Sequence, residues 1–130
     1  MVTIAIVDDD RFVRDALEDL IASLGHRVRT FQSADEFVNS GELAQVSCLI
    51  TDLQMPGMSG LDLQQHLLAN GNNTPVIFLT AFPEERTRSL ALSNGAMGFL
   101  EKPFEEADLT RYLDFALKVT KDRVGEKRQS

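Results

Sequence analysis

Short apolar runs rich in β-branched residues recur along the chain, and most of them stop at a polar residue. The run at residues 2–7 is followed directly by three aspartates, and the run at residues 46–52 itself ends on an aspartate. Runs of this length and composition are typical of strands that are buried on both faces of a sheet. We expect strands of this kind at residues 2–7, 46–52, 76–80 and 97–100, and a further strand at residues 27–31.

Amphipathic helical patterns separate these strands. After the first strand, Asp10 is a suitable N-cap, and Gly25 is a suitable residue just beyond the C-terminal end of a helix. Pro83 is expected to open a later helix at its first helical position, and Gly95 is expected to close it. Because parallel strands need helical crossovers, this alternation favours a doubly wound α/β fold, in which a five-stranded parallel sheet has helices on both faces.

Length and charge limit the class of protein. The 130 residues suffice for one domain, expected at residues 1–120, and the apolar periodicity then fades into a polar basic tail or linker at 121–130. The formal net charge is −7, and residues 1–117 hold 8 basic and 18 acidic side chains, whereas 118–130 hold 5 basic and 2 acidic ones. Nucleic-acid affinity depends on cations that neutralise phosphates, so we expect no direct nucleic-acid binding by these residues.

Neither membrane insertion nor secretion is expected. No apolar stretch approaches the roughly 18 residues that a membrane span needs, and the N-terminus lacks the basic start and apolar core of a signal peptide. The single cysteine, Cys48, lies in an apolar run and is expected to be a buried thiol. We therefore predict a cytoplasmic protein that has no membrane contact.

Polar side chains follow the ends of four predicted strands. Asp8 and Asp9 follow the first strand, Asp52 and Thr80 end the third and fourth, and Lys102 follows the fifth. The carboxyl ends of the strands in a doubly wound sheet meet at one edge, where ligands bind. Clustered carboxylates need a cation to offset their repulsion, and hard oxygen ligands in this small number suit Mg²⁺. The hydroxyl and the ammonium group are suited to hold a phosphoryl group beside the metal.

The same residues carry a resemblance to a known family. Four short signatures occur in order and with typical spacing: Val7-Asp8-Asp9, Asp52-Leu53-Gln54-Met55-Pro56-Gly57, Thr80-Ala81 and Lys102-Pro103. In these signatures the chain resembles the receiver domain of bacterial two-component response regulators, the CheY-like superfamily. Residues 1–120 are most similar to receivers of the FixJ type, through the stretches around Thr80 and Lys102. The resemblance implies a flavodoxin-like fold with strand order 2-1-3-4-5.

The resemblance also implies how a phosphoryl group would be held and sensed. Asp52 would be the phosphoacceptor, while Lys102 and Thr80 would contact the phosphoryl oxygens. Thr80 would move toward the phosphoryl group, and an aromatic residue three positions before the lysine would follow it. That residue is Phe99 here, in place of the commoner tyrosine, so it can report the switch only by packing.

A metal-ligand set is implied in the same way. Asp9, Asp52 and the backbone carbonyl of Gln54 would hold Mg²⁺, and Asp8 would act mainly through a coordinated water molecule.

Partners are implied as well. A sensor histidine kinase would donate the phosphoryl group, and the surface of the fourth helix, fifth strand and fifth helix would then control homodimerisation or an output domain. FixJ-type receivers commonly precede a helix-turn-helix DNA-binding domain, which these 130 residues do not contain. A stand-alone receiver without DNA output is the alternative. Either would be a phosphoacceptor that promotes its own phosphorylation and dephosphorylation, and not an enzyme.

Two other classes share part of this pattern. A phosphohydrolase of the haloacid-dehalogenase kind also uses an aspartate nucleophile with Mg²⁺, but its nucleophile belongs to an Asp-x-Asp pattern, and position 54 here is glutamine. A flavodoxin shares the topology, but three consecutive aspartates after the first strand would repel the phosphate of FMN. Both classes are therefore disfavoured.

Overall fold

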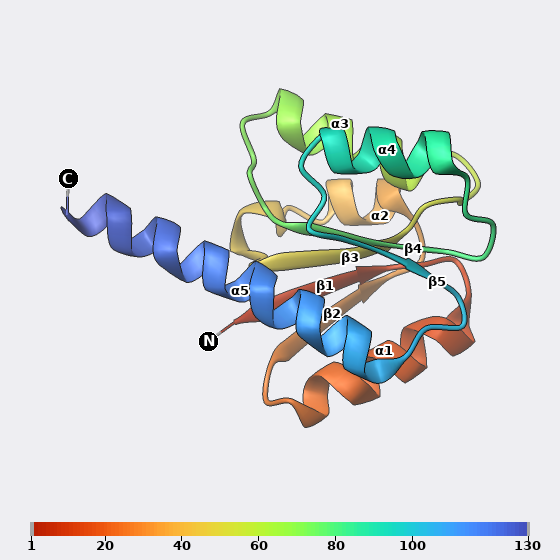
Figure 1. The fold of residues 1–130 in the computed structure, drawn as a ribbon, viewed down its shortest axis with the longest axis horizontal. Coiled ribbons are helices and arrows are strands. Elements are labelled where there is room, and N and C mark those ends of the chain that lie inside the picture. The colour runs from red at the N-terminus through yellow and green to blue at the C-terminus, as the bar shows by residue number, and fades with distance from the viewer. Residues whose placement is uncertain (1, 130) are drawn as a thin grey trace.

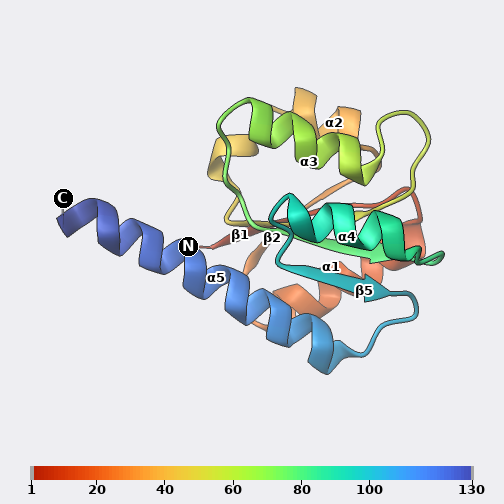
Figure 2. The same cartoon turned by 45° about the horizontal axis from the view of Figure 1, so that its top comes forward.

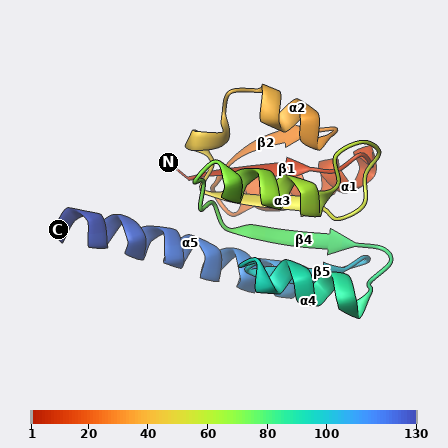
Figure 3. The ribbon, with the colours of Figure 1, turned by 90° about the horizontal axis from the view of Figure 1, so that it is seen from above.

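Five parallel strands form the centre of the computed structural model, which describes residues 2–129, with side chains described through residue 118. The strands are β1 (Thr3–Val7), β2 (Arg27–Phe31), β3 (Cys48–Asp52), β4 (Val76–Thr80) and β5 (Gly98–Glu101). They lie in the order β2-β1-β3-β4-β5, which can be followed in Figure 3. This is the implied order, and the winding direction reverses between β1 and β3, where doubly wound folds bind ligands.

Helices cover both faces of the sheet, as predicted. One face carries α1 (Arg11–Ser23) and α5 (Glu106–Gln129), and the other carries α2 (Ala34–Asn39), α3 (Gly60–Ala69) and α4 (Glu85–Ser93). In Figure 1 the first pair lies below the strands and the three other helices lie above them. The central strands β1, β3 and β4 therefore lie between helices on both sides, which explains why they are mostly apolar, whereas Arg27 and Arg29 of the edge strand β2 are exposed.

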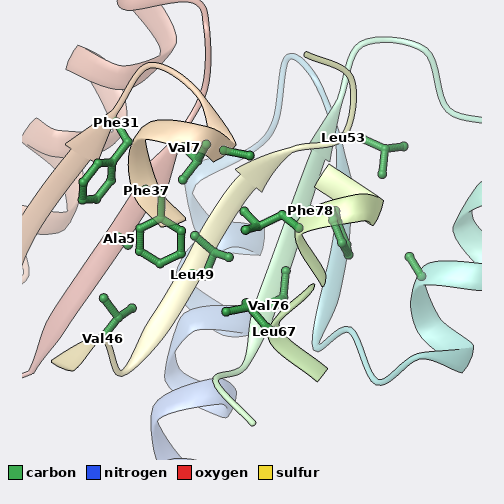
Figure 4. Packing of buried hydrophobic residues seen from close by; sticks show 13 residues of the cluster. Ala5, Val7, Phe31, Phe37, Val46, Leu49, Leu53, Leu67, Val76 and Phe78 are labelled. Atoms are coloured by element: carbon green, nitrogen blue, oxygen red, sulfur yellow. The ribbon is translucent and has the colours of Figure 1, made fainter. Parts of the chain in front are cut away.

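The alternation of side chains along each strand divides the core into two layers. In β1, Ala5 and Val7 face α2 and α3, while Ile4 and Ile6 face α1 and α5. Figure 4 shows the first layer, which contains the tilted ring pair Phe31 and Phe37, together with Val46, Leu49, Leu67 and Phe78. The second layer includes Leu17, Ile21, Leu109, Leu113 and Ala116 from the two helices. Fully burying one such aliphatic or aromatic side chain contributes about 1.5–3 kcal/mol.

Cys48 belongs to the second layer and is fully buried, as predicted. Burial raises the pKa of its thiol to about 12, because the thiolate would lose its hydration. The thiol therefore serves as a small apolar core group.

Most predicted helix ends agree with the structure, but one is wrong. The Asp10 side chain accepts the backbone N–H of Phe12 as the N-cap of α1, and Gly25 follows this helix with a φ of +90°. Pro83, however, does not occupy the first helical position of α4. Glu84 has an extended backbone (φ −122°, ψ 132°), and the helix begins only at Glu85. A proline restricts its own φ and does not force the next residue into a helix.

The last helix is longer than the sequence pattern indicates. Its backbone is helical as far as Gln129 and extends past the edge of the sheet in Figures 1 and 2. The side chains from residue 119 onward lie outside the described ones, so the expected domain boundary at residue 120 stays a prediction. No helix in the described part of the chain has both the length and the apolar character that crossing a membrane requires.

Candidate functional site

Four strands deliver polar side chains to one edge of the sheet. Asp8 and Asp9 follow β1, Asp52 is the last residue of β3, Thr80 is the last residue of β4, and Lys102 follows β5. Parallel pairing places all these ends at the same side, and the register sets Asp52 beside Leu79 of β4. All five predicted side chains are therefore grouped at the carboxyl edge of the sheet.

Three carboxylates converge at this edge around one ammonium group. Asp8, Asp9 and Asp52 each have an oxygen within 4.8 Å of an oxygen of the other two. Lys102 Nζ lies 2.9 Å from Asp8 Oδ2 and 3.3 Å from Asp52 Oδ2. Asp8 and Asp52 are buried, whereas Asp9 is exposed and its carboxylate has no hydrogen-bond or ion-pair partner among the described residues. The cluster thus combines two oriented carboxylates with one that is free to bind a ligand.

Local hydrogen bonds fix the two buried carboxylates. The backbone N–H of Asp10 donates to Asp8 Oδ1 at 2.9 Å, and the backbone N–H of Gln54 donates to Asp52 Oδ1 at 3.2 Å. The Arg14 guanidinium, one turn into α1, donates to the backbone carbonyl of Asp8 at 2.7 Å. Arg14 was not among the predicted site residues, because nothing in a helical pattern indicates that its side chain reaches back to the preceding loop.

The backbone of the β3–α3 loop approaches Asp52 closely. A Cβ added at Gly60 would meet the carbonyl oxygen of Asp52, so only glycine fits there without a shift. Ser59 and Asp62 form a capping box that starts α3 directly after this loop. Neither feature was predicted from the sequence, although the pattern Ser-x-x-Asp is a recognisable helix start.

The two predicted switch residues, Thr80 and Phe99, lie on neighbouring strands and have different environments. Thr80 is fully buried, and its Oγ1 accepts the backbone N–H of Phe82 at 3.1 Å. Phe99 is partly buried in β5, and its ring packs against Phe78 with centroids 6.4 Å apart and planes tilted by 50°. The Phe82 side chain is 70% exposed at the start of the β4–α4 loop.

The environment of the cluster raises the pKa of both Asp52 and Lys102, which favours the neutral form of the carboxyl group and the charged form of the lysine. Burial raises the pKa of Asp52 above its usual value, and the charge of Asp8 raises it further, while Lys102 and the Gln54 N–H only partly offset both. Burial on its own would lower the pKa of Lys102, but its hydrogen bond to Asp8 and the charges of both carboxylates outweigh burial and raise it. Lys102 is therefore firmly cationic, and the Asp52 carboxylate exists at a free-energy cost that a nearby cation would reduce.

The donor set fits Mg²⁺. With all three carboxylates ionised and one lysine among them, two negative charges are left uncompensated, which matches a divalent cation. The ligands are carboxylate oxygens, few in number and partly accessible, as Mg²⁺ sites with retained water molecules require. Asp8, Asp9 and Asp52 could hold such an ion; Gln54 is placed here through its N–H, and the role of its carbonyl stays a prediction.

Fold and site together define a doubly wound α/β protein with an acidic centre at the carboxyl ends of its strands. The response regulator receiver domain family matches residues 4–114, so the chain belongs to this family. Membership excludes the two other classes that share the pattern, the haloacid-dehalogenase phosphohydrolases and the flavodoxins.

Curated relatives and solved structures agree with this assignment. The chain is 44% identical over 117 residues to the response regulator protein TmoT of Ectopseudomonas mendocina, covering 89% of this chain and 53% of that protein. It is 32% identical to the transcriptional regulatory protein FixJ of Bradyrhizobium diazoefficiens, covering 88% of this chain and 56% of that protein. The structure of the response regulator StyR superposes with a TM-score of 0.90 at 37% identity over 98% of this chain and 64% of that chain. The structure described as FixJ-N superposes with a TM-score of 0.81 at 33% identity, over 91% of this chain and 94% of that chain.

The chain spans about half the length of the curated relatives it matches. The similarity therefore concerns the receiver domain, which is a phosphoacceptor domain and not a typical enzyme.

Proposed function

We propose that Asp52 accepts a phosphoryl group from a phosphohistidine of a sensor histidine kinase, in a reaction that needs Mg²⁺ at Asp8, Asp9, Asp52 and the Gln54 carbonyl. One observation carries the proposal: the buried Asp52 ends β3 within reach of two further carboxylates and the Lys102 ammonium group. A carboxylate that is only structural would not be surrounded by two like charges.

In this reaction an oxygen of the Asp52 carboxylate attacks phosphorus. An O–P bond forms, the P–N bond to the kinase histidine breaks, and the imidazole nitrogen keeps the electron pair of that bond. When bound, Mg²⁺ supplies positive charge to the phosphoryl oxygens and lowers the repulsion among the carboxylates. Phosphoryl transfer requires positioning and charge neutralisation more than covalent help, and this site offers both.

Lys102 and Thr80 complete the acceptor site. Lys102 already contacts an oxygen of Asp52, so its ammonium group would pair with a phosphoryl oxygen after transfer. Thr80 Oγ1 accepts the Phe82 N–H, and its hydroxyl would donate a hydrogen bond to another phosphoryl oxygen. The same groups would hold the phosphoryl group during attack by water, through which the domain promotes its own dephosphorylation.

Thr80 and Phe99 would change position on phosphorylation and so pass the state of Asp52 to the surface. The aspartyl phosphate adds about −1.5 to −2 charges and new acceptor oxygens, which draw the Thr80 hydroxyl and its loop inward. Phe99 lies on the neighbouring strand and packs on Phe78, so it would follow by changing its burial. This change would alter the surface of α4, β5 and α5, which would then control homodimerisation or an output domain.

The simplest output for the whole protein is the control of transcription. Longer relatives include proteins named as transcriptional regulatory proteins, and the matched region covers 56% of each of them. We infer a helix-turn-helix DNA-binding domain after a linker at residues 121–130, in a cytoplasmic protein whose receiver is residues 1–120. A receiver that acts alone on a protein partner is the alternative.

Acetyl phosphate tests the acceptor directly, because it replaces the kinase as the donor. The protein is incubated with acetyl phosphate, with and without Mg²⁺, and its intact mass is measured. We expect one base-labile phosphoryl group in the presence of Mg²⁺, none in Asp52→Asn, and normal modification in Asp19→Asn, which changes an exposed aspartate of α1. Modification that persists in Asp52→Asn would refute the proposal.

A further inference from the structure

Helix α4 is held to the rest of the domain by little apolar contact. Ala91 is its one buried residue, while Leu90 and Leu92 are 45% and 38% exposed. Its N-cap, Glu84, makes no side-chain hydrogen bond to the first turn. A helix without a capping bond and with one small buried side chain depends on whatever polar contact it makes with its neighbours.

Gln64 of α3 supplies such a contact. Its side chain is 3% exposed, and its Nε2 donates to the backbone carbonyl of Ala91 at 3.1 Å, across 27 positions of sequence. The Ala91 carbonyl also accepts the backbone N–H of Ala96 at 3.0 Å, in the turn that follows α4. The bond from Gln64 is therefore additional to this turn bond and joins two helices at the one buried position of α4.

The other half of the Gln64 amide is unsatisfied. Its Oε1 is buried and has no hydrogen-bond partner among the described residues. A cavity of about 210 Å³ is lined by Gln64, Leu67 and residues 72–76, and by Asn94, Gly95 and Met97, which follow α4 in the chain. A half-satisfied buried amide is costly, so the observed arrangement is not strongly favoured over one in which the helices shift and the oxygen gains a donor.

We propose that Gln64 is a positioning residue that holds α4 in its place in the unphosphorylated domain, and that breaking its bond to Ala91 lets α4 shift into the adjoining cavity. The β4–α4 loop begins directly after Thr80, so a shift of α4 is linked to the phosphoacceptor site. The inference rests on the proposed function for its regulatory meaning, and it concerns how the state of that site is passed to α4.

Hydrogen exchange of the unphosphorylated chain tests the contact. Gln64→Leu removes the donor and the unsatisfied oxygen together, while Gln65→Leu makes the same change at an exposed neighbour on α3. We expect amides of α4 to exchange about five- to tenfold faster in Gln64→Leu, as for the loss of one hydrogen bond, with unchanged exchange in the sheet and in Gln65→Leu. Equal α4 exchange in the two variants, or faster exchange throughout Gln64→Leu, would overturn the proposal.

Phosphorylation by acetyl phosphate tests the link to the site. If the released α4 is the arrangement that the phosphorylated domain prefers, the initial rate of Asp52 modification rises about two- to fivefold in Gln64→Leu and is unchanged in Gln65→Leu. Equal modification rates in the two variants would contradict a regulatory role for Gln64. Absence of modification in every form, wild type included, would instead contradict the proposed function. The hydrogen-exchange experiment would still show whether the Gln64 contact holds α4 in place.

Discussion

Lys102 and Asp8 form an ion pair across the end of the sheet, with Nζ 2.9 Å from Oδ2, although they are 94 residues apart in sequence. The Asp8 side chain is 1% exposed and that of Lys102 is 17% exposed. Their strands, β1 and β5, are separated in the sheet by β3 and β4. The pair therefore crosses directly over the end of β3, where Asp52 lies.

Replacing Lys102 with methionine keeps most of the length of the side chain and removes its charge. Without magnesium, we expect a loss of about 1–3 kcal/mol in the free energy of unfolding, because a buried carboxylate loses a charged hydrogen-bond partner. The raised pKa of Lys102 gives the matching pH effect: its stabilisation is present below the ordinary value of 10.5 and is lost as pH rises through the raised value. Urea unfolding measures both, with the exposed Lys118→Met as the control. Equal losses in the two variants would contradict this role.

Magnesium is expected to stabilise the folded domain. An ion that binds only the folded state contributes about 1 kcal/mol when its concentration is roughly five times its dissociation constant. Asp9→Asn removes an exposed ligand that has no other described partner, so most of this gain should disappear. Thermal unfolding with and without Mg²⁺ measures the effect, and Asp19→Asn, at an exposed position of α1, should keep the full gain. A gain that survives in Asp9→Asn would exclude Asp9 as a ligand.

Asp52 should make the metal-free domain less stable at neutral than at acidic pH. Its pKa is raised in the folded state, chiefly by burial and then by Asp8, so the folded protein binds the proton more tightly than the unfolded one. This contribution declines as pH rises from the ordinary value of 3.8 through the raised value, and is constant above it. Asp52→Asn should therefore be more stable than the wild type at pH 7, by a margin that shrinks toward pH 3. Urea unfolding at several pH values checks this, and a constant margin would contradict it.

Gly60→Ala tests the close approach of the first residue of α3 to Asp52. The added methyl group would collide with the backbone of Asp52 and Leu53, so we expect a loss of about 1–3 kcal/mol, as for an overpacked core, and slower phosphorylation of Asp52. Gly71→Ala is the matched control: its φ is +71° and no atom lies within 4 Å of the new methyl group. It should lose stability by about 1 kcal/mol through backbone strain and keep the wild-type phosphorylation rate. Equal phosphorylation rates in the two variants would exclude this contact as important.

The fold and the composition of the site could both be predicted from the sequence. Apolar runs that alternate with amphipathic helices leave few packings other than a covered parallel sheet, and parallel strands bring their carboxyl ends together by necessity. This is why the sequence alone sufficed to group Asp8, Asp52 and Lys102. The helix starts were less certain. Asp10 caps α1 as predicted, but Pro83 does not open α4, because a short helix end depends on a single residue's backbone angles.

Contacts between distant side chains were decided only by the tertiary structure. Arg14 reaches the carbonyl of Asp8, Gly60 lies against Asp52, and Gln64 joins α3 to α4 through Ala91. No local pattern marks these residues, because each contact depends on how far two packed elements approach one another and in which direction a side chain points. The sequence by itself determined which chemical groups meet at the edge of the sheet, since strand periodicity and parallel pairing suffice for that. The tertiary structure decided which of those groups are buried, which are paired and how firmly α4 is held, since burial and pairing arise only when the layers pack.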